Sequence, residues 1–404
     1  MPYDGTSPPS ILFIAGDVSG DVHAAALARA LLAHDPSRAI HALGGKRLRE
    51  AVAQSPGGVF LADTSDSSAI GVVSALLIYF HCRRLRGRLR EFLARHHVDL
   101  VILCDWGGFN RRIIAELHGR GLRIFYYFPP ASWQRSGTRA LCIVPYVSGV
   151  ATPFAWSAER LRAAGARAEW VGHPSLEYSG TMEERSAARR RYANGPNEKV
   201  IALLPGSRLT ELKVLGPRMA QTISLIQREM DARFIAAIPR ELAAQARRYL
   251  PDEVEIVSDQ TREILLAADA AIIKTGTGTL EGALAGTPQV TIYDVSLIGR
   301  IEWCVLWSWR WWRIRFIAMP NIILQRPVVP ELIGLNCRPE KIARELLRLL
   351  QDDQARRRML ADYALIAQAL GSELPISATE RTAQMVEETL SEITGRTVPE
   401  PARV

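Results

Sequence analysis

The chain has 404 residues, of which 48% are hydrophobic and 23% charged, as in globular proteins with room for two domains. Its formal net charge of +8 favours an anionic partner, namely nucleic acid, anionic lipid or a phosphorylated substrate. The sequence has no zinc knuckle, RNA-binding aromatic signature or helix-turn-helix pattern, so we expect no nucleic-acid partner.

Cysteine usage and hydropathy indicate a cytoplasmic protein. The five cysteines are scattered and never form a C-x-x-C pair, so we expect neither a disulfide framework nor a metal site. Residues 1–10 are polar and proline-rich, so we expect no signal peptide. Uninterrupted apolar runs stay below the roughly 20 residues that span a bilayer, which leaves attachment to a membrane surface as an option.

The first predicted strand, Ile11–Ala15, ends at a turn flanked by glycines. Residues 16–21 read Gly-Asp-Val-Ser-Gly-Asp and lead into a helix predicted over Val22–His34. The G-x-x-x-G spacing differs from the dinucleotide-binding fingerprint, which argues against a nicotinamide cofactor. Ser19 and Asp21 also fit an ordinary helix N-cap.

A longer apolar stretch, Ala69–Phe80, carries no charged residue and is followed by an arginine cluster in residues 83–90. An apolar helix that is too short to span a bilayer and ends in arginines is typical of an interfacial membrane contact. A buried helix followed by a solvated basic turn fits the same residues equally well.

A strand predicted at Leu100–Cys104 places Asp105 at its carboxyl end. The polar, arginine-rich segment Thr181–Lys199 is interpreted as a linker with a short helix, which puts a domain boundary there. Other strands of this domain are predicted at Arg123–Phe128, Val147–Thr152 and Ala168–Gly172.

The second half of the chain repeats the alternation of strands and helices. We predict an α/β protein of two Rossmann-like parallel-sheet domains, residues 1–180 and 197–350, facing one another across a cleft, with closing helices and a tail in residues 351–404. The predicted strands are Val200–Leu204, Arg233–Ile238, Val254–Val257, Ala270–Ile273 and Gln289–Tyr293, and the last helices are Pro339–Leu350, Gln354–Leu370 and Glu373–Thr394.

Residues 203–208, Leu-Leu-Pro-Gly-Ser-Arg, join a buried strand to a helix near the middle of the chain. The N–H groups of Gly206 and Ser207 and the guanidinium of Arg208 can together bind one phosphate group. The alternative is an ordinary strand-to-helix turn with a surface arginine.

Residues 274–281, Lys-Thr-Gly-Thr-Gly-Thr-Leu-Glu, form a second turn of this kind directly after a strand. Glu281 lies about one turn into the helix and could accept hydrogen bonds from ribose hydroxyls. A capped helix with a first-turn glutamate is the alternative interpretation. The candidate phosphate-binding residues of this turn are Gly276, Thr277, Gly278 and Thr279.

Residues 298–319 are dense in tryptophan and arginine. The charges exclude a helix that spans a bilayer, whereas indole and guanidinium groups favour the headgroup layer. This segment therefore predicts contact with a membrane surface.

In this order the motifs resemble the lipid-A-disaccharide synthase family, whose members are inverting glycosyltransferases with two Rossmann domains, the GT-B fold. The matching residues extend from about 11 to 350. In the first domain they are residues 15–21, Ile70-Gly71, Asp105 with Phe109-Asn110, Pro130 with Trp133, and Gly172-His173-Pro174. In the second domain they are Leu203 to Arg208 with Glu211, Gly276-Thr277 with Thr279-Leu280-Glu281, Met319 to Ile323, and Val329-Pro330-Glu331.

The resemblance implies transfer of 2,3-diacylglucosamine from UDP to 2,3-diacylglucosamine 1-phosphate, which gives the β-1,6-linked lipid A disaccharide 1-phosphate and UDP. It implies no metal and no organic cofactor, since the UDP-sugar is the donor substrate. The implied partners are the UDP-linked acylated glucosamine, a phosphorylated glycolipid acceptor and the inner-membrane surface. The protein would be peripheral on the cytoplasmic face of that membrane, and its oligomeric state is left open.

The resemblance also implies roles for individual residues. Asp105 matches the aspartate regarded as the catalytic base, which would take a proton from the acceptor hydroxyl. Arg208 matches the arginine of the donor-diphosphate site, and Asn321 matches the asparagine of the Pro-Asn motif. Glu281 is similar to the ribose-binding glutamate. His23 is the rival base, because imidazole titrates near neutral pH, and its alternative is a structural role.

Several positions depart from the family pattern. The changes at Gly108 and Pro129 lie in the acceptor-side domain, so a GT-B enzyme with another lipid or sugar acceptor is an alternative. A UDP-sugar 2-epimerase shares the double Rossmann fold but needs no membrane contact. A binding protein without chemistry is a third alternative, against which Asp105 and Arg208 argue. The departures are Asp17 for glutamate, Gly108 for aspartate, residues 129–135 for Ser-Pro-x-x-Trp-Ala-Trp, and Asp294 for a basic residue.

Overall fold

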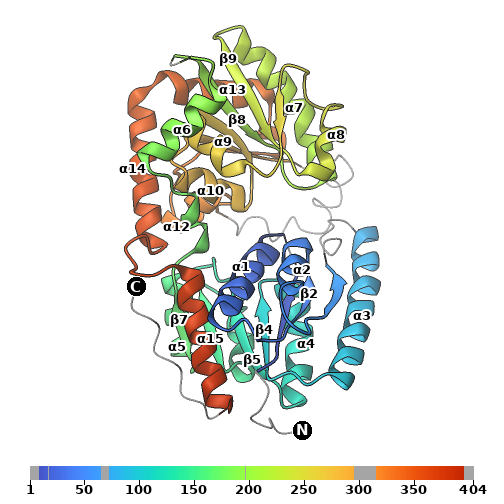
Figure 1. Cartoon of the computed structure of the whole chain (residues 1–404). Helices are drawn as coiled ribbons and strands as arrows, with labels where there is room; N and C mark the ends of the chain where they lie inside the picture. The colour runs from blue at the N-terminus through green and yellow to red at the C-terminus, as the bar shows by residue number, and fades with distance from the viewer. Residues whose placement is uncertain (1–8, 17, 65–71, 196, 295–314, 395–404) are drawn as a thin grey trace. The chain divides into compact units, whose positions relative to one another are not determined.

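The computed structural model describes residues 9–16, 18–64, 72–195, 197–294 and 315–394. Its contacts divide the chain into two compact units (Figure 1). The first unit contains Met1–Pro174 together with Leu370–Val404, and the second contains Ser175–Ala369. This division differs from the predicted domain boundaries, because the last helix belongs to the first unit and the predicted linker belongs to the second.

The first unit is built on a parallel sheet of seven strands in the order β3-β2-β1-β4-β5-β6-β7. The prediction missed β2, which pairs with β1, and β3, which pairs with β2. His41 interrupts the apolar run of β2, and Gly44 and Asp63 are the last residues of the two strands. The strands are β1 Ile11–Ala15, β2 Ile40–Gly44, β3 Phe60–Asp63, β4 Leu100–Cys104, β5 Arg123–Tyr127, β6 Gly149–Thr152 and β7 Ala168–Trp170.

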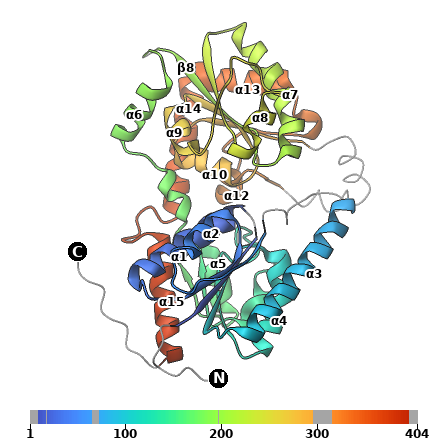
Figure 2. The same cartoon turned by 45° about the vertical axis from the view of Figure 1, so that its right-hand side comes forward.

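Helices cover both faces of this sheet, because alternate residues of a strand point to opposite sides. Ile11 and Phe13 of β1 pack in one core layer, and Leu12 and Ile14 pack in the other. The first layer contains α1 (Val18–His34), α2 (Lys46–Val52) and α15 (Ala378–Thr394). The second contains α3 (Val72–Arg95), α4 (Gly107–Gly119), the 3₁₀-helix Leu141–Tyr146 and part of α5 (Ala155–Ala163), and Figure 2 shows α3 beside α4.

Helix α3 continues through the arginine cluster, so the alternative interpretation of a solvated basic turn after Phe80 is wrong. Leu85, Leu89 and Phe92 are buried at helical spacing, which keeps this stretch against the core. Arg86 and Arg90 pair with Glu116 of α4. The side chains of residues 65–78 and the tryptophan-rich residues 298–314 lie outside the described part of the chain.

Helix α15 completes the first unit from the far end of the chain. Val386 and Leu390 are buried in the same layer as α1. The guanidinium of Arg381 donates two hydrogen bonds to Glu169 of β7, at 2.6 and 2.8 Å. The returning chain meets the outgoing chain where the His173 N–H donates to the Leu370 carbonyl at 2.9 Å.

The second unit has a parallel sheet of six strands in the order β10-β9-β8-β11-β12-β13. Five of them match predicted strands within one residue at each end, and β13 was not predicted. The strands are β8 Lys199–Leu204, β9 Ala232–Ala237, β10 Glu255–Val257, β11 Ala270–Lys274, β12 Gln289–Tyr293 and β13 Glu331–Ile333. The α-helices are α6 Met182–Tyr192, α7 Leu209–Gln227, α8 Ala243–Ala246, α9 Thr261–Ala267, α10 Thr277–Leu284, α12 Met319–Leu324, α13 Pro339–Gln351 and α14 Asp353–Ala369.

The segment predicted as a linker forms α6, which packs on the second sheet. Thr181 begins this helix with a capping box, in which its side chain and that of Glu184 bind each other's backbone N–H. Ala188 and Tyr192 are buried in the core beside α9. Arg189 pairs with Asp269 at the start of β11, which fixes the helix to the sheet.

We predict that Leu390→Ala lowers the free energy of unfolding by about 2–5 kcal/mol, because it leaves a cavity beneath α15. Urea denaturation measures the change. The matched control is Leu365→Ala on α14, where the side chain is exposed and we expect a change within about 0.5 kcal/mol. Equal effects of the two substitutions would contradict the packing of α15 in the core of the first unit.

Candidate active site

Each sheet has one pair of neighbouring strands from which the chain continues in opposite directions. In the first unit this pair is β1 and β4, and in the second it is β8 and β11. The loops after such strands diverge, and open parallel sheets bind ligands at this topological switch point. Asp105 directly follows β4, at the switch point of the first unit. The turns 205–208 and 275–278 follow β8 and β11, at the switch point of the second.

Asp105 lies in a turn with an unusual backbone. Asp105 and Trp106 have φ angles of +50° and +46°, a left-handed conformation that non-glycine residues rarely adopt. Three hydrogen bonds hold the turn: the Asp105 N–H donates to Tyr127 O at 3.1 Å, and Tyr126 Oη and Asn110 Nδ2 each donate to Asp105 O at 2.9 Å. Asn110 of the Phe109-Asn110 motif is fully buried, so this residue has a structural role here.

The glycines of the first predicted turn make room for the Asp105 loop. A Cβ on Gly16 would lie 1.9 Å from the Trp106 ring, and a Cβ on Gly20 would lie 3.2 Å from Asp105 Cβ. These glycines therefore allow close approach of α1 to the carboxyl end of β4. Asp17 lies outside the described residues.

Asp21 caps a helix other than the one predicted. Its carboxylate accepts hydrogen bonds from the N–H groups of Gly45, Arg47 and Leu48, at 2.7, 3.0 and 3.2 Å. These groups begin α2, so Asp21 connects α1 to the N-terminus of α2. Burial raises the pKa of Asp21, and the three backbone hydrogen bonds oppose that shift.

His23 lies in a buried aromatic cluster. Its ring stacks on Phe128 with centroids 4.6 Å apart, and the ring of His173 stands edge-on at 6.2 Å. Burial lowers the pKa of His23 to about 4, and burial with the nearby His23 lowers the pKa of His173 to about 3. Both imidazoles are therefore neutral at pH 7 and weakly basic, which makes His23 the poorer candidate base.

In the second unit, Glu211 connects the two turns at the switch point. Glu211 Oε2 accepts a hydrogen bond from the Ser207 N–H at 3.1 Å. Glu211 Oε1 lies 3.3 Å from Arg208 Nη1 and 2.7 Å from Lys274 Nζ. Gly206 has φ +115°, and a Cβ there would lie 2.1 Å from Glu211 Oε2, so this position needs glycine. Arg208, which follows β8, and Lys274, at the end of β11, thus share one carboxylate.

The turn after β11 has exposed and buried residues with different roles. Gly276 and Thr277 are exposed and Gly278 is half-buried at the start of α10. Thr279 is fully buried, and its hydroxyl donates to Gly276 O at 2.7 Å and accepts from Met319 N–H at 3.1 Å. Thr279, which we predicted to bind phosphate, therefore holds the loop, while Thr277 and Gly278 remain accessible.

Asn321, the asparagine that matches the Pro-Asn motif, has a structural role. Its Nδ2 donates to Val329 O and to Glu331 Oε1, and its Oδ1 accepts from the N–H groups of Val328 and Val329. These four bonds use the full capacity of a side-chain amide. Asn321 thus attaches α12 to the start of β13.

Glu281 lies on α10, behind the exposed residues of the turn. Burial, together with the nearby carboxylate of Glu177, raises the pKa of Glu281 to about 7, and a hydrogen bond with Tyr178 opposes the shift. A carboxyl group with this pKa can both donate and accept hydrogen bonds near neutral pH. This is compatible with contact to hydroxyl groups of a ligand.

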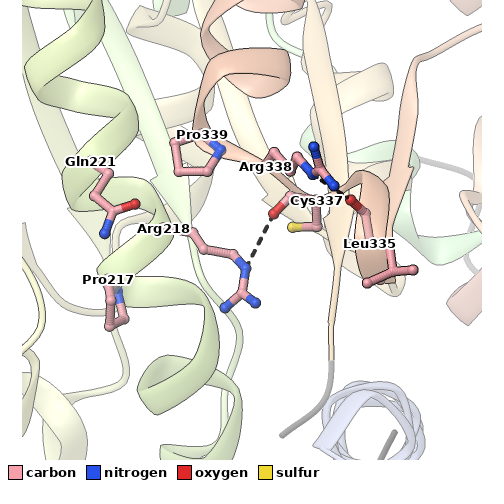
Figure 3. A pocket seen from close by; sticks show the side chains of 8 residues that line it. Pro217, Arg218, Gln221, Leu335, Cys337, Arg338 and Pro339 are labelled. Atoms are coloured by element: carbon pink, nitrogen blue, oxygen red, sulfur yellow. Dashed lines mark hydrogen bonds between the residues drawn. The ribbon is translucent and has the colours of Figure 1, made fainter. Parts of the chain in front are cut away.

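The departure at Asp294 is explained by a partner on α7. The Asp294 carboxylate is buried and forms an ion pair with Arg218, whose Nε donates to Cys337 O at 3.1 Å. Arg218 lines a surface cavity of about 410 Å³ with Gln221 and Leu335 (Figure 3). A second cavity of about 720 Å³ lies beside Arg185 on α6. Neither cavity is lined by the predicted site residues.

The structure brings the two predicted phosphate-binding turns together within the second unit, and it places Asp105 and His23 in the first. Sequence reasoning gave no role to Lys274 or to the bridging contact of Glu211, although both residues stand in the quoted motifs. Within the described ranges, no group of three or more His, Cys, Asp or Glu side chains is arranged to hold a metal ion.

Comparison with known proteins gives consistent matches over most of the chain. The family model described as lipid-A-disaccharide synthetase matches residues 11–386. A lipid-A-disaccharide synthase of Nitrosococcus oceani is 31% identical over 392 residues, which cover 94% of this chain and 97% of the relative.

Solved structures share the fold at low sequence identity. A glycotransferase of kitacinnamycin has a TM-score of 0.58 at 15% identity, with 95% of this chain and 99% of the other covered. A putative UDP-N-acetylglucosamine 2-epimerase from Listeria monocytogenes has a TM-score of 0.56 at 13% identity, with 98% and 100% covered. These likenesses show the GT-B fold in both transferases and epimerases.

We predict that Glu281→Gln changes how stability depends on pH. The folded protein holds a proton on Glu281 up to pH about 7, whereas the unfolded chain releases it near 4.5. Stability from this group is therefore lost as the pH rises between those values. The variant should gain stability relative to the wild type between pH 5 and pH 8 in urea denaturation.

The control for this measurement is Glu340→Gln, at an exposed position on α13. Its difference from the wild type should be the same at both pH values. A parallel response of the two variants would show that Glu281 is not the buried group responsible.

Proposed function

Since the chain belongs to the lipid-A-disaccharide synthase family, we propose that it transfers 2,3-diacylglucosamine from UDP to 2,3-diacylglucosamine 1-phosphate. The products are the β-1,6-linked lipid A disaccharide 1-phosphate and UDP. That the chain is a glycosyltransferase follows from its family. The observation that supports these particular substrates is the family match over residues 11–386.

We propose Asp105 as the general base of this reaction. An acceptor hydroxyl becomes a good nucleophile when a positioned carboxylate takes its proton during the attack. The left-handed turn at Asp105 and Trp106 is held by hydrogen bonds to its backbone, which supports a fixed position for this residue. Inversion at the donor carbon follows if the hydroxyl displaces UDP in a single step.

The second unit supplies the positive charge for the leaving group. As the bond to the sugar breaks, negative charge grows on the diphosphate of UDP. Arg208 and the N–H groups at the start of α10 are placed at the switch point, where cations and helix N-termini favour that charge. We therefore propose a metal-independent departure of UDP, with Glu281 bound to the ribose.

We propose peripheral attachment to the cytoplasmic face of the inner membrane. Tyr79 and Phe80 of α3 are 52% and 56% exposed, and the following Arg83 and Arg84 are exposed as well. Aromatic and arginine side chains together favour the headgroup region. None of the helices that the structure describes has the length and apolar character needed to cross a bilayer.

The reaction is tested by mass spectrometry of products formed from UDP-diacylglucosamine and diacylglucosamine 1-phosphate. We expect a disaccharide 1-phosphate and one UDP per bond formed. UDP release with no disaccharide would mean that water takes the sugar, and it would contradict the proposed acceptor. A changed sugar after incubation with UDP-N-acetylglucosamine alone would support an epimerase instead.

We predict that Asp105→Asn lowers kcat by about 10²- to 10⁴-fold while UDP binding is retained. Asparagine tolerates the left-handed backbone at this position, so the turn should persist. His23→Asn is measured in parallel and should lose less activity. A larger loss in His23→Asn, or loss of UDP binding in Asp105→Asn, would contradict the assignment.

We predict co-sedimentation of the protein with vesicles that contain phosphatidylglycerol, and partial release by salt. Tyr79→Ser combined with Phe80→Ser should reduce the bound fraction. The matched control is Leu360→Ser combined with Leu365→Ser, two exposed apolar positions on α14. Equal binding of both double variants would exclude Tyr79 and Phe80 of α3 as a membrane contact.

A further inference from the structure

Two cations share the carboxylate of Glu211, because Arg208 and Lys274 both contact it. Arg218 contacts the carboxylate of Asp294, which directly follows β12, the strand next to β11. The side chain of Lys274 is 19% exposed and that of Glu211 is 13% exposed. Partial burial strengthens the electrostatic field of these charged groups.

The two cations lie where the fold favours an anion. Lys274 is the last residue of β11, and the turn that contains Arg208 follows β8, the strand next to it in the sheet. Helices α7 and α10 begin directly after these two loops, and their N-termini add partial positive charge. A diphosphate bound at this switch point would meet cations from both sides.

Glu211 keeps the two cations in place. One of its oxygens holds both Arg208 Nη1 and Lys274 Nζ, and the other accepts from the Ser207 N–H. Without this carboxylate the two like charges would repel each other. Glu211 thus positions a pair of donors that can turn toward a ligand with greater negative charge.

We propose that Lys274 is a second diphosphate-binding residue of the nucleotide site, held beside Arg208 by Glu211 until the donor binds. The proposal rests on the proposed function in one respect, namely that the donor is a UDP-sugar. The ammonium group bonds a phosphate oxygen directly, whereas the uracil and ribose are bound elsewhere in the same unit.

The test compares UDP with uridine, because only UDP carries the diphosphate. Isothermal titration calorimetry on the full chain measures both Kd values for the wild type and for Lys274→Met. We expect the Kd for UDP to rise by about 10- to 100-fold, as for loss of a charged hydrogen bond, and the Kd for uridine to stay unchanged. Retained uridine binding also shows that the variant is folded.

Two further lysine variants sharpen the result. Lys274→Arg keeps the charge and should restore most of the affinity for UDP. Lys213→Met removes an exposed lysine of α7 and should leave both Kd values unchanged. An equal loss in Lys213→Met would attribute the effect to net charge and overturn the proposal. Unchanged UDP affinity in Lys274→Met would overturn it as well.

Glu211→Gln separates a direct contact from an indirect one. If Lys274 binds the diphosphate itself and Glu211 only positions it, Glu211→Gln should weaken UDP binding much less than Lys274→Met does, because the ammonium group is still present. If Lys274 only holds Glu211 in place, then Glu211→Gln should weaken UDP binding as much as Lys274→Met does. That outcome would overturn the proposal.

The product assay distinguishes this proposal from the proposed function. A wild-type protein that binds UDP through Lys274 but forms no disaccharide would contradict the lipid reaction and support the binding role. A protein that forms the disaccharide while Lys274→Met binds UDP normally would do the reverse.

Discussion

The two sheets share one constraint, which is that parallel strands connected outward in both directions leave a gap between the loops of their two central strands. In the first unit that gap belongs to β1 and β4, and Asp105 comes directly after β4. In the second it belongs to β8 and β11, which end beside Arg208 and Lys274. Helices pack on the faces of the sheets, and the loops at these gaps follow the carboxyl ends of the strands. Everything that the family assignment implies about catalysis depends on side chains placed by this topology.

The cost of placing them is visible in the backbone. Left-handed residues cost about 1–3 kcal/mol each, and Asp105 and Trp106 form a consecutive pair. Hydrogen bonds from Tyr126 and Asn110 to the Asp105 carbonyl offset that strain. At the second gap the corresponding difficulty is electrostatic, because Arg208 and Lys274 approach each other and Glu211 lies between them. Hydrogen bonds in the first unit and ion pairs in the second therefore fix the side chains at these gaps, as the proposed reaction requires of a site that is organised before its ligand binds.

The sequence predicts the central strands well, because Leu100–Cys104 and Ala270–Ile273 are continuous apolar runs buried on both faces. It fails for β2 and β3, because His41 interrupts the apolar run of β2, and Gly44 and Asp63 shorten the apolar runs of the two strands. The helical continuation of α3 was readable in the spacing of its leucines, but the arginines between them suggested a turn. The roles of Thr279 and Asn321 do not follow from the residues next to them in the sequence. Thr279 accepts a hydrogen bond from Met319, 40 residues away, and Asn321 of α12 accepts one from Val329 in the loop before β13. Glycine at positions 16 and 20 likewise leaves room for Trp106 and Asp105, which come close only in the folded chain.

The return of α15 to the first unit has a consequence for how the protein forms. The second unit, residues 175–369, is an insertion between two parts of the first, and the two crossing segments touch at His173 and Leu370. During synthesis on a ribosome the inserted unit can complete its core before α15 has been made to cover the apolar face of α1. That face is protected only when residues 378–394 have left the exit tunnel. Until then this face is exposed apolar surface, which makes incompletely folded chains prone to aggregation.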